Sequence, residues 1–137
     1  MGVSILICGD VCPTASNREL FESGNTERLF GNLLPEFLAA DYRTVNLECA
    51  LTHTNNPIFK AGPNLKETPD CINGIAKLGI NLVSMSNNHI LDYGKEGLRD
   101  TLNAVQSKNL DWVGVGDDSK EARRIFYKEI KGKQIAF

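Results

Sequence analysis

The sequence predicts an α/β fold with a mainly parallel sheet and flanking helices. Short apolar segments of strand length alternate with segments of helical periodicity, which is typical of parallel α/β proteins. Several apolar segments are uninterrupted, as expected for strands covered on both faces. Polar residues follow three of the predicted strands directly. The chain of 137 residues has the size of one domain, so we expect residues 1–137 to belong together.

The first part of the chain predicts two strands and one helix. Residues 3–8 form a continuous apolar run, which we expect to be a central strand. Residues 17–30 are polar and mixed, with a Gly-Asn pair in the middle, and are expected to be mainly loop. Pro35 suits the first position of a helix that runs to about residue 40. Residues 44–47 then form the second strand, with Glu48 at its carboxyl end.

The middle of the chain predicts a long loop, a helix and the third strand. Residues 53–66 contain two prolines and several asparagines, and long loops in compact domains are often functional. Thr68 and Pro69 are typical of a helix start, and Gly79 is typical of the position just after a helix end. Residues 80–85 are apolar and form the third strand.

The last part predicts a helix, a strand and a hairpin. Residues 86–94 form a polar loop, and residues 95–108 a helix with one apolar face. Residues 112–115 are expected to be the fourth strand, and residues 118–124 a short helix. Residues 125–130 and 134–137 flank a Lys-Gly pair and predict a β-hairpin. The last residues are apolar, so we expect a truncated, N-terminal part of a longer domain.

Composition excludes several classes of function. Hydrophobic residues make up 42% and charged residues 23% of the chain, and the formal net charge is -2. No global basic field would therefore attract nucleic acid. The apolar runs are much shorter than the ~20 residues of a membrane helix, and we expect no signal peptide in this chain. The four cysteines lack metal or redox spacing, so we expect free thiols in a reducing compartment.

Three polar clusters follow predicted parallel strands. Asp10 follows Gly9 after the first strand, Asn46 and Glu48 end the second, and residues 86–89, which include Asn88 and His89, follow the third. Ligands of open α/β sheets bind outside the carboxyl ends of the strands. We therefore expect these side chains to converge at one edge of the sheet.

These residue types predict a divalent metal site. Carboxylate, amide and imidazole groups suit Mn, Fe, Zn or Mg, and a two-metal site is possible with this set. Glu48 is the candidate bridging ligand, while Asp10 would hold one metal and Asn88 the other. His89 would protonate a leaving group or stabilise charge on a substrate oxygen.

Each of these residues also has an ordinary structural explanation. Asp10 is typical of a turn or a helix cap, and Asn87 and Asn88 of a turn. His89 alone is more often a loop histidine than a catalyst. Lys60 would either reach an anion over the site or lie in solvent. The glycines at 114 and 116 are a weak nucleotide motif and more typical of a tight turn.

The motifs resemble one known family. CGDV (8–11), VNLECALT (45–52), FKAGPN (59–64), SMSNNHILDYGKEGLRDTL (84–102) and VGVGDDSKEA (113–122) occur in the order seen in CapA/PgsA-type proteins of bacterial capsule synthesis. That family is associated with poly-γ-glutamate and is similar in fold to calcineurin-like metallophosphoesterases. The resemblance implies the N-terminal part of a metallophosphoesterase-like α/β sandwich.

The resemblance also implies roles for individual residues. Asp10 matches the first aspartate of the phosphoesterase motifs, Glu48 takes the place of the bridging aspartate, and the Asn88-His89 pair matches the family's Asn-His pair. Asp92 belongs to the family signature and is expected near the site, as a catalytic residue with His89. We expect Lys60 and Asn87 to bind substrate. Cys12 stands where phosphoesterases usually have a histidine, and their later histidine motifs would lie beyond residue 137.

Two functions follow from these expectations. The first is a metal-dependent hydrolase, active when full length, that acts on a phosphoester or on a linkage of a polyanionic polymer. The second is a non-catalytic, polymer-binding component of a capsule synthesis or export machine. An open sheet edge would favour a homodimer. The chain itself carries no anchor and would be cytoplasmic, whereas family members are often membrane-anchored and face outward.

Overall fold

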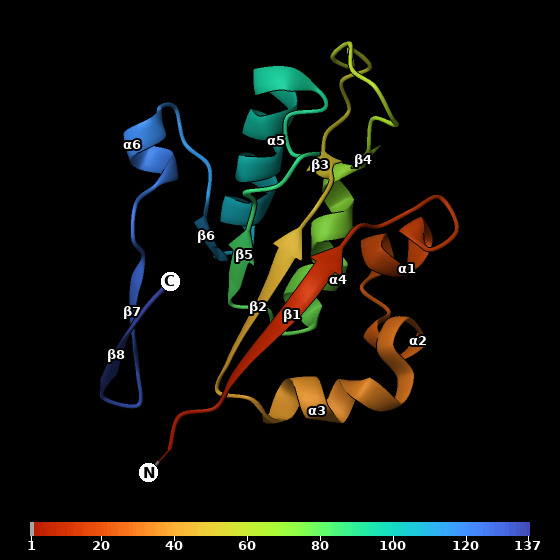
Figure 1. Cartoon of the computed structure of the whole chain (residues 1–137). Helices are drawn as coiled ribbons and strands as arrows, with labels where there is room; N and C mark the ends of the chain where they lie inside the picture. The colour runs from red at the N-terminus through yellow and green to blue at the C-terminus, as the bar shows by residue number, and fades with distance from the viewer. Residues whose placement is uncertain (1) are drawn as a thin grey trace.

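The computed structural model describes residues 2–137 and contains the predicted parallel sheet (Figure 1). Four strands form it in the order β1-β2-β5-β6, and all neighbouring strands are parallel. These strands are β1 (Ile5–Val11), β2 (Tyr42–Leu47), β5 (Leu82–Ser84) and β6 (Asp111–Val113). The α/β class and the parallel sheet with flanking helices are therefore confirmed.

Short helices and two small sheets complete the fold. The helices are α1 (Arg18–Ser23), α2 (Thr26–Phe30), η1 (Gly31–Leu33), α3 (Leu34–Ala39), η2 (Pro69–Cys71), α4 (Ile72–Lys77), α5 (Gly94–Ser107) and α6 (Ser119–Ala122). The remaining strands are β3 (Ala50–Leu51) with β4 (Lys66–Glu67), which are parallel, and β7 (Tyr127–Ile130) with β8 (Lys133–Ala136), which are antiparallel.

Two apolar clusters cover the two faces of the main sheet. The larger one joins Val45 and Val83 of the sheet to Ile75 of α4 and Val105 of α5, all of them buried. The smaller one lies on the other face, where the hairpin β7–β8 packs against β2 and β5. Its buried members are Tyr42, Leu82 and Ile130. Leu82 and Val83 are consecutive in β5 and enter different clusters, because successive side chains of a strand point to opposite faces of the sheet.

The prediction that the first strand is central was wrong. β1 pairs only with β2 and forms one edge of the sheet, and Ile7 in it is 74% exposed. An uninterrupted apolar run does not distinguish a strand with two neighbours from an edge strand. β1 is also longer than predicted and includes Asp10, with an irregularity in its register between Ile7 and Asp10.

The prediction of a loop over residues 17–30 was also wrong, because the segment forms α1 and α2. Gly24 adopts the left-handed conformation that ends α1, with φ 64°. Asn25 then caps α2, since its side-chain oxygen accepts a hydrogen bond from the Arg28 backbone N–H at 3.1 Å. The Gly-Asn pair is therefore a junction between two helices. Phe21 of α1 is buried against α4.

The other helix and turn signals gave the right positions. α3 and α5 lie where they were predicted, and Gly79 follows α4 with φ 72°. Thr68 does not cap its helix with its side chain, because its hydroxyl donates to a Glu22 carboxylate oxygen at 2.5 Å instead. The hairpin turn has positive φ at both Lys131 and Gly132, as a type I′ turn requires. Within residues 2–137, no helix has the length and apolar character to cross a membrane.

Candidate functional site

Polar side chains connect three neighbouring strands at their carboxyl ends. Asp10 of β1 lies opposite Asn46 of β2 in the sheet register. The Asn46 side-chain amide donates to Asp10 Oδ1 at 2.6 Å, and the Asn87 amide donates to Asn46 Oδ1 at 3.1 Å. Asn87 follows β5, so the chain of hydrogen bonds crosses β1, β2 and β5 in order. The expected meeting of Asp10 with the ends of β2 and β5 is thus present in the structure.

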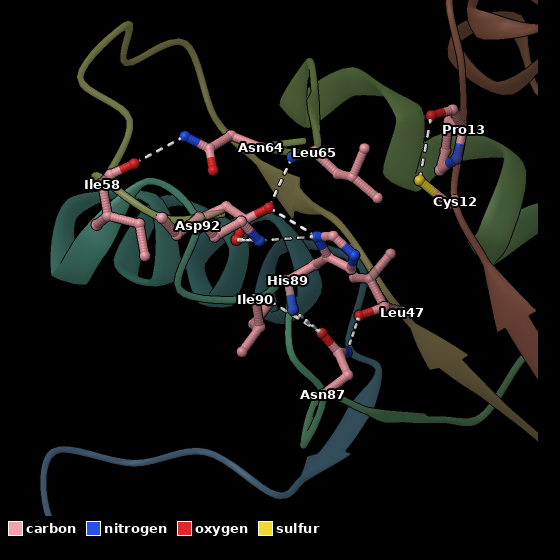
Figure 2. A network of polar contacts seen from close by, with 11 residues as sticks. Cys12, Pro13, Leu47, Ile58, Asn64, Leu65, Asn87, His89, Ile90 and Asp92 are labelled. Atoms are coloured by element: carbon pink, nitrogen blue, oxygen red, sulfur yellow. Dashed lines mark hydrogen bonds and ion pairs between the residues drawn. The ribbon is translucent and has the colours of Figure 1, made fainter. Parts of the chain in front are cut away.

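Asn87 organises the turn that carries the candidate histidine (Figure 2). Its Nδ2 also donates to the Leu47 carbonyl at 2.9 Å, and its Oδ1 accepts from the backbone N–H groups of His89 at 3.0 Å and Ile90 at 2.9 Å. Both ends of the amide are therefore bonded within the protein. This arrangement fixes the path of residues 87–90 relative to β2. Substrate binding by Asn87 remains a prediction.

Asp92 is the buried centre of the site. Its side chain is 0% exposed, whereas those of His89 and Lys60 are 13% and 20% exposed. Asp92 Oδ2 lies 2.8 Å from His89 Nδ1 and accepts from the Leu65 backbone N–H at 2.7 Å. The Lys60 ammonium donates to Asp92 Oδ1. A buried charge needs partners of this kind, and both oxygens of this carboxylate have them.

These contacts determine the protonation state of Asp92 and the tautomer of His89. Burial by itself raises the pKa of Asp92, but hydrogen bonds from Lys60, His89 and the Leu65 backbone outweigh it and hold the pKa below its usual range. Asp92 is therefore ionised near neutral pH. Its carboxylate favours the His89 tautomer that carries the proton on Nδ1, although the Lys60 nitrogen lies only 3.2 Å from the same atom. Nε2 of His89 is left for other partners.

Asp92 also anchors the long loop between β3 and β4. Its backbone carbonyl accepts from the Ile58 N–H at 2.8 Å, and its side chain accepts from Leu65 and Lys60. Asn64 links the loop to itself by donating to the Ile58 carbonyl at 2.9 Å. The predicted loop over residues 53–66 is confirmed up to β4, and contacts with Asp92 and His89 hold it to the site. Sequence analysis placed Asp92 and Lys60 near the site but did not pair them.

Glu48 and Asn88 lie at the same edge but take no part in this network. Glu48 follows β2, and its backbone N–H donates to the Val11 carbonyl at 3.0 Å. Glu48 is partly exposed and Asn88 is exposed. Within the described range 2–137, no three His, Cys, Asp or Glu residues lie close enough together to hold a metal ion. Two carboxylates and an amide are an incomplete ligand set, so these residues alone do not fit a two-metal site.

The Cys12 thiol donates to the Pro13 carbonyl at 3.7 Å (Figure 2). The buried Cys49 thiol nearby lowers the pKa of Cys12, although burial acts in the opposite direction. All four cysteines are free thiols, as predicted.

Asn46 belongs to the polar cluster at the end of the second predicted strand, but sequence analysis assigned no specific role to it. In the structure, the parallel register of β1 and β2 places Asn46 beside Asp10. Asn46 connects Asp10 to Asn87 and is thus the central link of the network.

The fold and site define a parallel α/β domain with a polar network at the carboxyl edge of its sheet. Comparison with known proteins shows that the chain belongs to the family described as "Bacterial capsule synthesis protein PGA_cap", whose model matches residues 4–137. The chain is 26% identical over 137 residues to the capsule biosynthesis protein CapA of Bacillus anthracis. It is 28% identical over 138 residues to the PGA biosynthesis protein CapA of Bacillus subtilis (strain 168).

These relatives are much longer than this chain. Each comparison covers 98% of this chain but only 33% of the Bacillus anthracis protein and 36% of the Bacillus subtilis protein. A probable polyglutamine synthesis accessory protein of Mycobacterium tuberculosis is 33% identical over 89 residues, which are 65% of this chain and 23% of that protein. The chain therefore spans about a third of the first two relatives.

Proposed function

We propose that this chain supplies the amino-terminal part of a hydrolytic site that acts on a linkage of a capsule polymer, with poly-γ-glutamate as its substrate class. One observation carries the proposal: the buried Asp92 carboxylate orients His89 at the carboxyl edge of the parallel sheet. Membership in a capsule synthesis family supports the choice of polymer. The names of the relatives, which refer to capsule, PGA and polyglutamine synthesis, agree with it.

Each side chain of the network has a role in this proposal. Asp92 holds the Nδ1 proton of His89, so that the unprotonated Nε2 faces the reaction. There it takes a proton from the attacking water and passes it to the leaving group as the linkage breaks. Lys60 balances the charge of Asp92 and presents a cation to an anionic substrate. Asn87 holds the turn in place through its bonds to the His89 and Ile90 backbone.

A divalent metal is a further part of the proposal. Mn, Fe, Zn or Mg would be held by Asp10, Glu48 and Asn88, and would supply Lewis-acid chemistry when bound. Because these donors are an incomplete set, further ligands would have to come from the part of the full-length protein that this chain does not cover.

The test uses the full-length protein that contains this chain. Purified poly-γ-glutamate is incubated with the wild type, and its chain length is followed by gel electrophoresis and by end-group labelling. His89→Ala should reduce cleavage at least 100-fold, given that general acid catalysis contributes about 10²–10⁴-fold. His53→Ala is the matched control, because His53 is an exposed loop residue outside the network. Equal activity of His89→Ala and wild type would refute the role of His89.

Metal content is measured on the same preparations. Stoichiometric Mn, Fe or Zn in the wild type and its loss in Glu48→Ala are the expected results. Retention of all metal by Glu48→Ala would refute the proposed ligand.

The incomplete ligand set also favours a second function, in which the protein binds the polymer without cleaving it. This function predicts that the full-length protein contains no metal under replete conditions and leaves the polymer length unchanged, yet still binds it. Cleavage that is abolished by His89→Ala would exclude this second function.

A further inference from the structure

Two neighbouring hollows connect the candidate site to the outer side of α5. The first, of about 260 Å³, includes Ser86 and Asn87 in its wall and thus begins at the turn before His89. The second, of about 210 Å³, runs along α5. Both hollows are lined by Leu91, Leu98 and Gly116, so they are consecutive sections of one groove. We call it the α5 groove.

The α5 groove has an apolar floor and a cationic outer end. Leu91, Leu98 and Leu102 line its outer section, and Leu91 is 49% exposed. Lys95 and Arg99 line the same section and are four residues apart on α5, so they lie on one face of the helix. Among residues 2–137, neither of them belongs to an ion pair.

Two acidic residues, Asp117 and Glu121, lie near these two cations. Asp117 lines the outer section from the segment between β6 and α6, and its backbone N–H donates to a Glu121 carboxylate oxygen at 2.7 Å. Glu121 packs against Gly116 in the groove wall, so the two carboxylates equal the two cations in formal charge. Lys95 and Arg99 are exposed on α5 and have no ion-pair partner among residues 2–137, so both can receive an anionic group of a ligand.

We propose that the α5 groove binds an extended acidic chain whose carboxylates are carried on aliphatic stems. The methylene groups of such a ligand would lie on the three leucines, and its carboxylates would reach Lys95 and Arg99. A small inorganic anion would gain nothing from the apolar floor, whereas an uncharged apolar ligand would gain nothing from the two cations. The inference rests on the proposed function, since the groove leads the same polymer to the turn that carries His89.

The groove explains how one domain can hold a flexible polymer near a small reaction site. A linkage positioned at residues 87–89 would leave the next units of the chain in the first section of the groove and later ones between Lys95 and Arg99. Binding energy from these distant units would then position the linkage that reacts. The groove thus acts as a binding subsite and takes no part in bond breaking.

The test measures binding separately from cleavage. A fluorescein-labelled decamer of γ-linked glutamate is titrated with the full-length protein in excess chelator, and fluorescence anisotropy gives its Kd. The double variant Lys95→Glu/Arg99→Glu should weaken binding at least tenfold. Lys108→Glu/Lys133→Glu makes the same change in net charge at two exposed positions outside the groove and should stay within twofold of the wild type.

Each outcome separates this inference from the proposed function. Equal binding by the wild type and Lys95→Glu/Arg99→Glu would refute the proposal that the α5 groove binds the polymer, even if polymer cleavage depends on His89. An equal loss in Lys108→Glu/Lys133→Glu would also overturn it, since binding would then follow net charge alone. A selective loss in the groove variant supports the inference, and it does so even if the wild type never cleaves the polymer.

Discussion

Replacement of Asp92 by asparagine tests the centre of the site most directly. Asp92→Asn keeps the shape of the side chain but removes its charge and replaces one oxygen by an NH₂ group. In the wild type, Asp92 Oδ1 accepts from Lys60, and Asp92 Oδ2 accepts from the Leu65 N–H and faces His89 Nδ1. Whichever oxygen is replaced, the new NH₂ group meets a hydrogen-bond donor. The variant therefore has an unsatisfied contact as well as a lysine without its counter-ion.

The structure sets the size of the effect. Removing one partner of a buried ion pair costs about 3–5 kcal/mol. The Asp92 side chain is 0% exposed, but the Lys60 side chain is 20% exposed and recovers some hydration. Asparagine also keeps one acceptor. We therefore expect a loss of about 3 kcal/mol in the free energy of unfolding, which is a large part of the 5–15 kcal/mol typical of a domain.

Urea unfolding followed by fluorescence of Trp112, the single tryptophan, gives this free energy. Asp70→Asn is the matched control, because Asp70 is exposed, and it should change the value by at most about 0.5 kcal/mol. Adding Lys60→Met to Asp92→Asn removes the unpaired ammonium and should cost less than the two single changes added together. A loss below about 1 kcal/mol in Asp92→Asn, or strict additivity in the double variant, would refute the proposed pairing.

Three further predictions follow from the same structure. Gly74→Ala should lower the Tm, because a Cβ at this position would lie 2.7 Å from Phe21 Cδ1. Overpacking of this kind lowers the free energy of unfolding by about 1–3 kcal/mol. An unchanged or higher Tm would contradict this packing. Because folding lowers the pKa of Asp92, its charge stabilises the protein above the unfolded value of about 3.9, and this stabilisation is lost as pH falls through the lower folded value. Between pH 5 and 2, the free energy of unfolding in urea should therefore fall more steeply for the wild type than for Asp92→Asn. Parallel curves would exclude this contribution of Asp92. Burial raises the pKa of Cys71 to about 11, so iodoacetamide should modify Cys71 more slowly than the partly exposed Cys8. Peptide mass spectrometry measures both rates, and equal rates would contradict the buried position of Cys71.

The sequence was informative about the site because topology alone brings strand ends together. Once the alternation of strands and helices predicts a parallel sheet, all carboxyl ends must lie at one edge, and residues after them become neighbours. Asp10 and Asn87 were placed correctly for this reason, although 77 positions separate 10 from 87 in the numbering. The same logic places Asn46 at this edge, and the register of β1 and β2 brings it opposite Asp10.

Other features depend on contacts that no local pattern encodes. Whether an apolar strand lies at the edge or the centre of a sheet depends on its neighbours, and β1 has only one. The helices α1 and α2 are short and polar, and their stability comes from capping and from the packing of Phe21 on α4. The pairing of Lys60 with Asp92 requires the long loop to fold back, which its composition does not indicate.

The loop and the candidate catalytic pair depend on one another through Asp92. The loop is held by Asp92 through its carbonyl and both carboxylate oxygens, and the same carboxylate orients His89. An anion that draws Lys60 away from Asp92 would therefore remove one of the contacts that hold the loop. The position of the loop and the orientation of the His89 ring thus depend on the same carboxylate.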